Sequence, residues 1–224
     1  MRSRIVISML GLLVATSVAA FGDTFVFGGS GANSGATLTV STTDGSFSFA
    51  VPYDDLLQKF DQGWWSATNP NYPQNGNYFV GNNQGRLLND FFSFNLSSFD
   101  GGATSAYLTI TPTSYGANWD GVTYAVGGVS TPASILDNTD GTSAAIFADL
   151  GKGNYGSYLF GADYPGSVVI NLDSAALADI NAATGGWFSV GGTLNAAAVP
   201  EPGSCALLGM GLVALGVALR RRRA

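Results

Sequence analysis

Histidine is absent from this 224-residue chain, and its single cysteine, Cys205, lies near the C-terminus. Without histidine, no Ser-His-Asp or Cys-His catalytic arrangement can form. Without cysteine before residue 205, the long central part of the chain can hold neither a disulfide framework nor a zinc site built from His and Cys. Acid–base chemistry would have to use carboxylates alone, and we expect the protein not to be an enzyme.

Positive charge and glutamate are also scarce. Residues 21–199 contain 14 aspartates, no glutamate and three cations (Lys59, Arg86 and Lys152), which gives a net charge of −11. Because binding to phosphates requires clustered Lys and Arg, this composition excludes nucleic acid as a partner. Few Lys and no Glu remove the residues that best form exposed helices, and the 31 glycines of the chain provide many turns. The central part is therefore expected to be rich in strands.

The N-terminus has the order of a secretory signal. Arg2 and Arg4 precede an apolar stretch over residues 5–18, and small residues follow at the position that a signal peptidase inspects. We predict a signal peptide over residues 1–20 that is cleaved after Ala20. The alternative is a buried helix of the core.

The C-terminus contains a second apolar stretch, residues 203–219, which has no charged side chain and precedes a cluster formed by Arg220, Arg221, Arg222 and Arg223. As a helix this stretch would rise about 25 Å, enough to span a bilayer with modest adjustment. Dense cationic clusters stay in the cytoplasm, so the N-terminal end of the helix should lie outside. We predict a transmembrane helix over residues 203–219, with residues 220–224 as a basic tail that retains the C-terminus in the cytoplasm.

A short extended linker, residues 196–202, joins the central part to this helix. Pro200 and Pro202 fix the backbone in an extended form that a protease cleft can accept, and between them stands Glu201, the only glutamate of the chain. A spacer would not need this one exception among the acidic residues. The simpler alternative is a membrane anchor with a stiff linker.

The triplet Pro200-Glu201-Pro202, the apolar stretch and the terminal arginines together resemble the PEP-CTERM sorting signal of Gram-negative bacteria, over residues 196–224. The resemblance implies that exosortase, a membrane-embedded cysteine transpeptidase, recognises the triplet and removes the anchor. It also implies export through the inner membrane, transient anchoring there, and an association with exopolysaccharide production. Signal peptidase, exosortase, the membrane and an extracellular polysaccharide are therefore the expected partners.

Residues 21–195 have the pattern of a β-sandwich domain. Polar and apolar residues alternate over residues 37–41 and 46–51 around Asp44-Gly45, which predicts a hairpin. Similar short runs separated by Gly-, Asn- and Asp-rich turns occur at residues 24–27, 91–96, 106–111, 122–126, 144–147, 157–160, 167–172 and 187–194. No helix of crossover length separates them, so we predict a mainly β fold, an antiparallel sandwich of jelly-roll type.

Two short helices are expected beside the strands, at residues 174–183 with Asp173 as N-cap, and at residues 54–60. Residues 61–85 are expected to form a long polar loop. Residues 85–110 resemble the DNRLRE-type carbohydrate-binding jelly rolls, because an Arg-Leu-Leu and a Phe-Asn-Leu-Ser segment precede a Ser-Ala-Tyr-Leu strand. That resemblance implies a fold preference and no binding residue, since Asn95 replaces the Asp of the pattern.

Loop aromatics are the candidate binding residues. Trp64, Trp65, Tyr72 and Trp119 could stack on sugar rings; the alternative is that they pack at the edge of the sandwich. Asp54-Asp55 is the nearest approach to a carboxylate pair for glycan hydrolysis. Residues 137–142, "DNTDGT", resemble half of a calcium loop and are more simply a turn. No cofactor is expected, and the open alternative is a calcium ion bound by several Asp and carbonyl oxygens.

The sequence therefore predicts an exported protein of the cell surface or extracellular matrix, processed by exosortase and structural or adhesive in role. The alternative is a carbohydrate-binding module, and a carboxylate-dependent glycan hydrolase is the third candidate.

Overall fold

The computed structural model describes residues 25–29, 35–54, 59–70, 77–83, 85–115, 120–138, 142–163 and 165–196. All of them belong to one compact unit, Asp23–Ala197. The predicted signal peptide (residues 1–20), the transmembrane helix (residues 203–219), the sorting triplet and the arginine cluster lie outside the described residues. No helix in the described ranges is long and apolar enough to cross a membrane.

The smaller sheet contains the predicted hairpin. It has four antiparallel strands in the order β13 (Val168–Asn171), β9 (Ser105–Thr111), β2 (Gly35–Ser41) and β3 (Ser46–Ala50). In β2, Leu38 and Val40 are fully buried, while the alternate residues Thr37 and Thr39 face outward. Gly45 adopts a φ of +152° in the hairpin turn, a region that glycine tolerates best. Alternating polarity therefore predicted both the strands and the buried face correctly.

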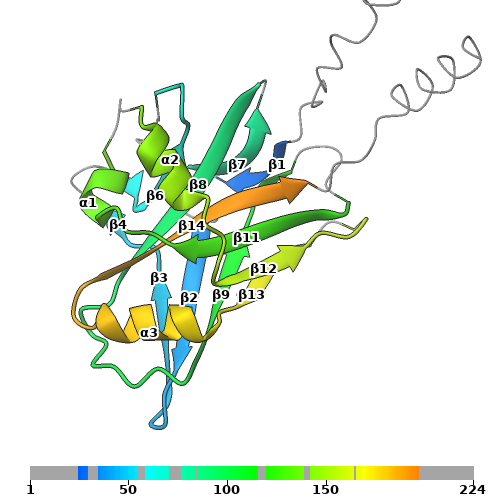
Figure 1. Ribbon diagram of the computed structural model, residues 1–224. Helices are drawn as coiled ribbons and strands as arrows, with labels where there is room; N and C mark the ends of the chain where they lie inside the picture. Colours follow the sequence, from blue (N-terminus) through cyan, green and yellow to red (C-terminus); the bar gives the residue numbers. More distant parts are fainter. Residues whose placement is uncertain are drawn as a thin grey trace, which may run out of the picture. The chain divides into compact units, whose positions relative to one another are not determined.

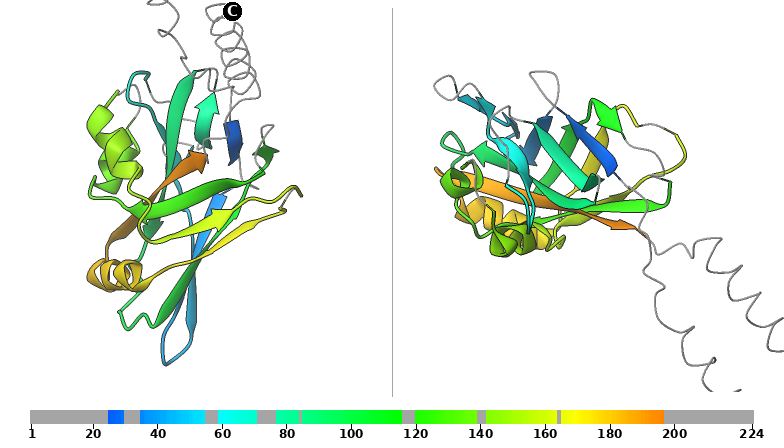
Figure 2. Two further views of the ribbon diagram at one scale, coloured as in Figure 1. Left: turned by 45° about the vertical axis from the view of Figure 1, so that its right-hand side comes forward. Right: turned by 90° about the horizontal axis from the view of Figure 1, so that it is seen from above.

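The larger sheet curls into a half-barrel around β8. Its order is β10 (Ser114–Tyr115), β1 (Phe25–Gly29), β7 (Tyr78–Asn83), β8 (Arg86–Asn95), β14 (Trp187–Ala196), β11 (Val122–Gly128) and β12 (Gly156–Leu159). An eighth strand, β6 (Gln62–Trp65), pairs with β8 beyond the β7 pairing. Figure 1 shows β11, β12 and β14 crossing in front of β2 and β9 at a wide angle, and Figure 2 gives two further views of these layers.

Two apolar clusters hold these layers together. The main core lies between the sheets, where Leu38 and Leu108 of the smaller sheet meet Phe92, Tyr124 and Val190 of the larger sheet. A second cluster lies on the opposite face of the larger sheet and consists of Trp65, Phe91, Leu136 and Leu150. Burying both faces of β8 in this way explains why its residues 88–94 are all buried.

Three short helices occur in the described residues, where the sequence predicted one or two. They are α1 (Ala133–Leu136), α2 (Ala144–Leu150) and α3 (Ser174–Ala182). The α3 prediction is confirmed, because the Asp173 carboxylate accepts hydrogen bonds from the backbone N–H groups of Ala175 (2.9 Å) and Ala176 (3.0 Å). The prediction of a mainly β fold built from antiparallel sheets is likewise confirmed, while the jelly-roll type of sandwich stays a prediction.

Three local predictions were wrong. Residues 144–147 belong to α2, not to a strand, because the Ser143 hydroxyl caps the helix at Ile146 N–H and Leu150 anchors it on the larger sheet. In the predicted helix at residues 54–60, the described residues 54, 59 and 60 belong instead to two short paired strands, β4 (Tyr53–Asp54) and β5 (Lys59–Phe60), and residues 55–58 lie outside the described residues. The predicted loop at residues 61–85 contains β6 and β7, whose hydrogen-bond partners lie on β8 and β1. Such pairing is invisible to local sequence patterns.

Candidate functional site

Helices α1 and α2 cover one part of the outer face of the larger sheet, and none of the helices that the structure describes covers the remaining part (Figure 1). Along β14, alternate residues face outward, so Trp187, Ser189 and Gly191 lie on the same side as Asn95, Ser93 and Phe91 of β8. The part of β14 that α2 covers begins at Gly191. The backbone of α2 lies so close there that a Cβ at Gly191 would be 2.6 Å from Cα of Leu150. Helix α2 can therefore sit directly on the strand.

Trp187 lies on the uncovered half and is 46% exposed. The neighbouring floor of the sheet is polar: the hydroxyls of Ser93 and Ser189 are hydrogen-bonded at 2.8 Å. Among the described residues, Trp187 and Tyr107 are the exposed large aromatics, and Tyr107 lies on the other sheet. An aromatic ring is thus presented to solvent above a hydroxyl-bearing strand pair.

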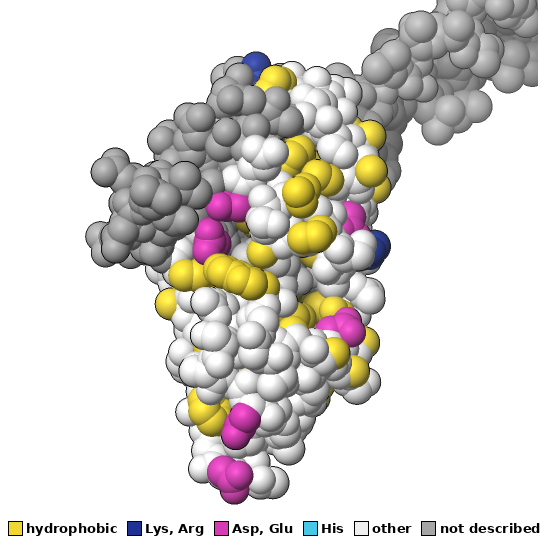
Figure 3. Space-filling model, turned by 90° about the vertical axis from the view of Figure 1, so that its left-hand side faces the viewer, with side chains coloured by type: hydrophobic (Ala, Val, Ile, Leu, Met, Phe, Trp, Pro, Cys, Tyr) yellow, Lys and Arg dark blue, Asp and Glu magenta, His cyan; other side chains and the backbone are white. Residues whose placement is uncertain are grey.

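Two open hollows meet at Trp187. The first has a volume of about 730 Å³ and is lined by Asp61, Val129, Ser130, Thr131, Pro132, Ala133, Ser134, Asp137, Trp187 and Ser189. The second has a volume of about 510 Å³; Trp187, Ser189, Val129 and Ser130 border both, and Lys152, Asn154, Tyr155 and Asp179 lie at its far side. Both volumes fall within the range of ordinary ligand pockets. Figure 3 shows a face of the molecule where acidic and hydrophobic side chains lie close together and basic ones are few.

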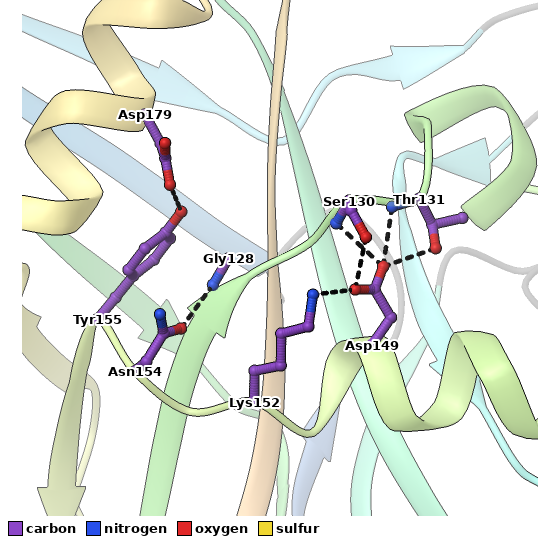
Figure 4. Close-up of polar contacts among 8 residues, drawn as sticks. All are labelled: Gly128, Ser130, Thr131, Asp149, Lys152, Asn154, Tyr155 and Asp179. Atoms are coloured by element: carbon purple, nitrogen blue, oxygen red, sulfur yellow. Dashed lines mark hydrogen bonds and ion pairs between the residues drawn. The ribbon is translucent and has the colours of Figure 1, made fainter.

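Asp149 of α2 holds the wall between the hollows in place (Figure 4). Its carboxylate accepts hydrogen bonds from the backbone N–H groups of Ser130 (3.0 Å) and Thr131 (2.8 Å) and from their hydroxyls (2.8 and 2.7 Å), and it pairs with Lys152. Burial by itself would raise the pKa of Asp149, but the hydrogen bonds from Lys152, Thr131 and Ser130 outweigh it and lower that pKa well below its usual range. Asp149 therefore stays ionised as a structural anchor.

Tyr155 shapes the far side of the second hollow. Its hydroxyl donates a hydrogen bond to the Asp179 carboxylate of α3, and its ring lies so close to β11 that a Cβ at Gly128 would be 2.3 Å from the hydroxyl oxygen. The Gly128 N–H donates to Asn154 Oδ1 at 3.2 Å (Figure 4). Burial, followed by the hydrogen bond and charge of Asp179, raises the pKa of Tyr155, so the phenol remains a proton donor.

Asp90 is the other acid with a large pKa change, and it lies away from the hollows. It is fully buried in the main core, where Tyr124 donates a hydrogen bond to Oδ1 at 2.9 Å and Oδ2 has no hydrogen-bond partner among the described residues. Burial raises the pKa of Asp90 from 3.8 to about 7, and the hydrogen bond from Tyr124 only partly offsets it. With no exposed surface, this carboxyl cannot contact an external substrate.

The tryptophans predicted to bind sugars are buried. Trp64 is 7% exposed and Trp65 is 3% exposed, so neither offers a free ring face for stacking. Trp65 instead belongs to the cluster under α1, and its indole N–H donates to the Leu136 carbonyl at 2.9 Å. Trp64 and Trp65 therefore pack inside the protein, which was the alternative to sugar binding, because pairing of β6 with β8 places them there.

The remaining predicted positions are only partly described. Tyr72, Trp119 and Asp55 lie outside the described residues, as do Thr139, Asp140 and Gly141 of the possible calcium loop. In the described ranges, no three acidic side chains gather closely enough to hold a metal ion. Trp187 was missed because it falls in a predicted strand, where a tryptophan is expected to face the core. The polar residues Ser189 and Thr193 alternate with Trp187 on the same face of β14, and they were the sequence signal that this face points outward.

Comparison with known protein families finds a match for one segment of the chain. Residues 198–223 match the family described as the PEP-CTERM protein-sorting motif. This motif implies an exported protein that exosortase processes and sorts to the cell surface, as the sequence predicted. No curated protein and no solved structure matches the chain, and the resemblance to DNRLRE-type jelly rolls receives no support.

Proposed function

We propose that this exosortase substrate is a structural or adhesive component of the cell surface or extracellular matrix, associated with exopolysaccharide. The observation that carries the proposal is the sorting motif at residues 198–223, which follows a β-rich body. The body offers no histidine or cysteine for nucleophilic catalysis. This composition favours a binding surface over a catalytic site.

The outer face of the smaller sheet supports this role. The outward positions of its hairpin and of β9 are mostly hydroxyl-bearing and none is charged: Thr37, Thr39, Ser41, Ser46, Ser48, Ser105, Thr109 and Thr111. Across the strands, Ser41 and Ser46 hydroxyls are 3.2 Å apart and those of Thr39 and Ser48 are 3.5 Å apart. A sheet face of this kind can exchange hydrogen bonds with the hydroxyls of a hydrated polysaccharide without a charge penalty.

The alternative function, a carbohydrate-binding module, keeps one specific observation in its favour. Burial excludes Trp64 and Trp65 as residues that stack on a sugar ring. The exposed Trp187, by contrast, borders two polar hollows. Tyr72 and Trp119 stay predictions. A glycan hydrolase would need two carboxylates at working distance in one cleft, and Asp54-Asp55 stays an untested candidate for that pair.

The sorting step is tested by Glu201→Ala in a host that contains exosortase. We expect the variant to remain full-length and membrane-bound, because the only acidic group of the recognition triplet is lost. Mass spectrometry of the mature C-terminus and membrane fractionation provide the measurement. Asp44→Ala, at an exposed hairpin turn, is the matched control and should be processed normally. Normal processing of Glu201→Ala would contradict the assigned role of the triplet.

The matrix role is tested by locating the processed protein in hosts with and without exopolysaccharide. We expect it in the matrix fraction of the first host and free in the medium of the second, because hydroxyl-rich surfaces retain it only when the polysaccharide is present. Equal release from both hosts would contradict the matrix association while leaving the sorting step intact.

A further inference from the structure

The surface around Trp187 has the features of a binding site, and no sequence motif had pointed to it. A half-exposed indole is costly to leave in water unless it has a partner, since large aromatic side chains dominate both cores and interfaces. The ring borders two hollows at once, one lined also by Asp61 and Asp137 and the other by Lys152 and Asp179. A ligand that uses both would be elongated and would pass over the ring.

The first hollow favours a ligand with many hydroxyl groups. Its lining includes the hydroxyls of Ser130, Ser134 and Ser189 and the carboxylates of Asp61 and Asp137. The hydroxyls of Ser130 and Ser189 are hydrogen-bonded to Asp149 and Ser93 and keep further hydrogen-bonding capacity. Hydroxyls both donate and accept hydrogen bonds, and carboxylates accept two or more. Its apolar side chains, Val129, Pro132 and Ala133, are small, so an apolar ligand would bury little surface against them.

The charge of the described lining residues disfavours polyanions at the same surface. In the described residues that line the first hollow there are two aspartates and no cation. The second hollow has one cation, Lys152, and that side chain is already paired with the Asp149 carboxylate. A polysaccharide rich in uronate groups would therefore be repelled, whereas an uncharged one would meet no electrostatic penalty.

We infer that the groove formed by the two hollows binds a segment of uncharged polysaccharide, with one pyranose ring stacked on Trp187. The C–H face of a pyranose is apolar and matches the indole face, while the ring hydroxyls reach the polar groups of the first hollow. Asp149 is a positioning residue here, because it fixes Ser130 and Thr131 in the wall between the hollows. This inference deepens the proposed matrix role and rests on it, since it names the chemical class to which the protein adheres.

The test is affinity electrophoresis of the full chain, in mild detergent, through native gels that contain dextran, hydroxyethylcellulose, galactomannan or xylan, with an alginate gel as the charged comparison. We expect at least one neutral polysaccharide to retard the wild type and alginate to leave it unaffected. Trp187→Ala should weaken the apparent association by about tenfold, since loss of one aromatic stacking contact has an effect of that order. Trp187→Phe, which keeps a ring, should retain most of the binding.

Val169→Ala is the matched control, because Val169 is also about half exposed (48%) but lies on the smaller sheet. It should leave the retardation unchanged. Thermal unfolding of each variant should match the wild type, since Trp187 is not part of the core, and Trp187→Phe provides the comparison if the alanine variant is unstable. No retardation by any neutral polysaccharide, stronger retardation by alginate, or equal retardation of Trp187→Ala and wild type would overturn the inference.

Failure of this inference is separable from failure of the matrix role. Trp187→Ala should be processed like the wild type, because the sorting segment is unchanged. If it is also retained in the matrix and shows normal retardation in the gels, the groove is not the binding site although the matrix role stands. If the wild type is retarded but is released equally from hosts with and without exopolysaccharide, the groove stands and the matrix role does not.

Discussion

Two buried aspartates of this protein, Asp90 and Asp149, have opposite acid–base behaviour. Asp90 lies between the sheets with a single side-chain donor, Tyr124, and its pKa rises to about 7. Asp149 lies at the foot of α2 with donors from Ser130, Thr131 and Lys152, and its pKa falls well below the usual range. Asp90 is fully buried and has few donors, whereas Asp149 is less deeply buried and has more donors, including the charged Lys152. Both differences favour the neutral form at Asp90 and the ionised form at Asp149.

The comparison also separates two structural roles. A carboxylate with five donors can fix a loop, because every lone pair that the charge needs is satisfied. Asp90 has one side-chain donor, Tyr124, and backbone hydrogen bonds at Asp90 and Gly192, which do not outweigh its complete burial. The neutral carboxyl is therefore favoured, and it makes the stability of the fold sensitive to pH. The three experiments below test this difference, beginning with the largest expected effect.

The pH dependence of stability should come from Asp90. Its folded-state pKa is raised from 3.8 to about 7, so between these values the folded state binds more protons than the unfolded state. Raising the pH from 4 to about 8 should therefore lower the free energy of unfolding, by up to about 4 kcal/mol, with little further loss above that range. The lowered pKa of Asp149 acts only below about pH 4, in the opposite direction.

Urea unfolding of the processed protein at several pH values measures this dependence. Asp90→Asn, which cannot ionise, should flatten the stability profile between pH 4 and 7. Asp163→Ala, at an exposed loop position, is the control and should keep the wild-type slope. A variant at position 90 with an undiminished slope would show that another group causes the pH dependence.

Gly192→Ala should disrupt the pair that Asp90 forms with Tyr124. A Cβ at Gly192 would lie 2.0 Å from the Tyr124 hydroxyl oxygen and 2.1 Å from Asp90 Oδ1, and the packed core offers these atoms no space to move. We expect a loss of about 3 kcal/mol in the free energy of unfolding. Gly161→Ala, whose Cβ would meet nothing within 4 Å, should change stability little. Equal stability of the two variants in urea unfolding would refute the close packing.

Asp149→Ala should have the smallest effect of the three, about 2 kcal/mol, because the donors that it leaves behind are near the surface and water can replace part of the carboxylate. Asp149→Asn should lose less, since an amide oxygen still accepts hydrogen bonds from Ser130 or Thr131. Thermal unfolding at pH 7 provides the measurement, with Asp163→Ala again as control. If Asp149→Ala were as stable as the control, the hydrogen bonds around it would contribute nothing.

Part of the fold could be predicted because its cause is local. Alternating residues specified β2 and β3 with their buried faces, and Asp173 followed by a short run of helix formers specified α3 and its cap. Residues 144–147 show the limit, since their apolar character fits a strand or a helix equally well. The Ser143 cap and the packing of Leu150 on Gly191 decided for the helix.

The candidate site shows the same division. The chain by itself determined the absence of histidine, the acidic body and the sorting segment at residues 198–223, because these follow from residue identity and order alone. Tertiary structure alone decided that Trp64 and Trp65 are inside and Trp187 is outside. An aromatic ring is buried or exposed according to what packs on its strand, and here those neighbours, α1, α2 and β8, come from distant parts of the sequence.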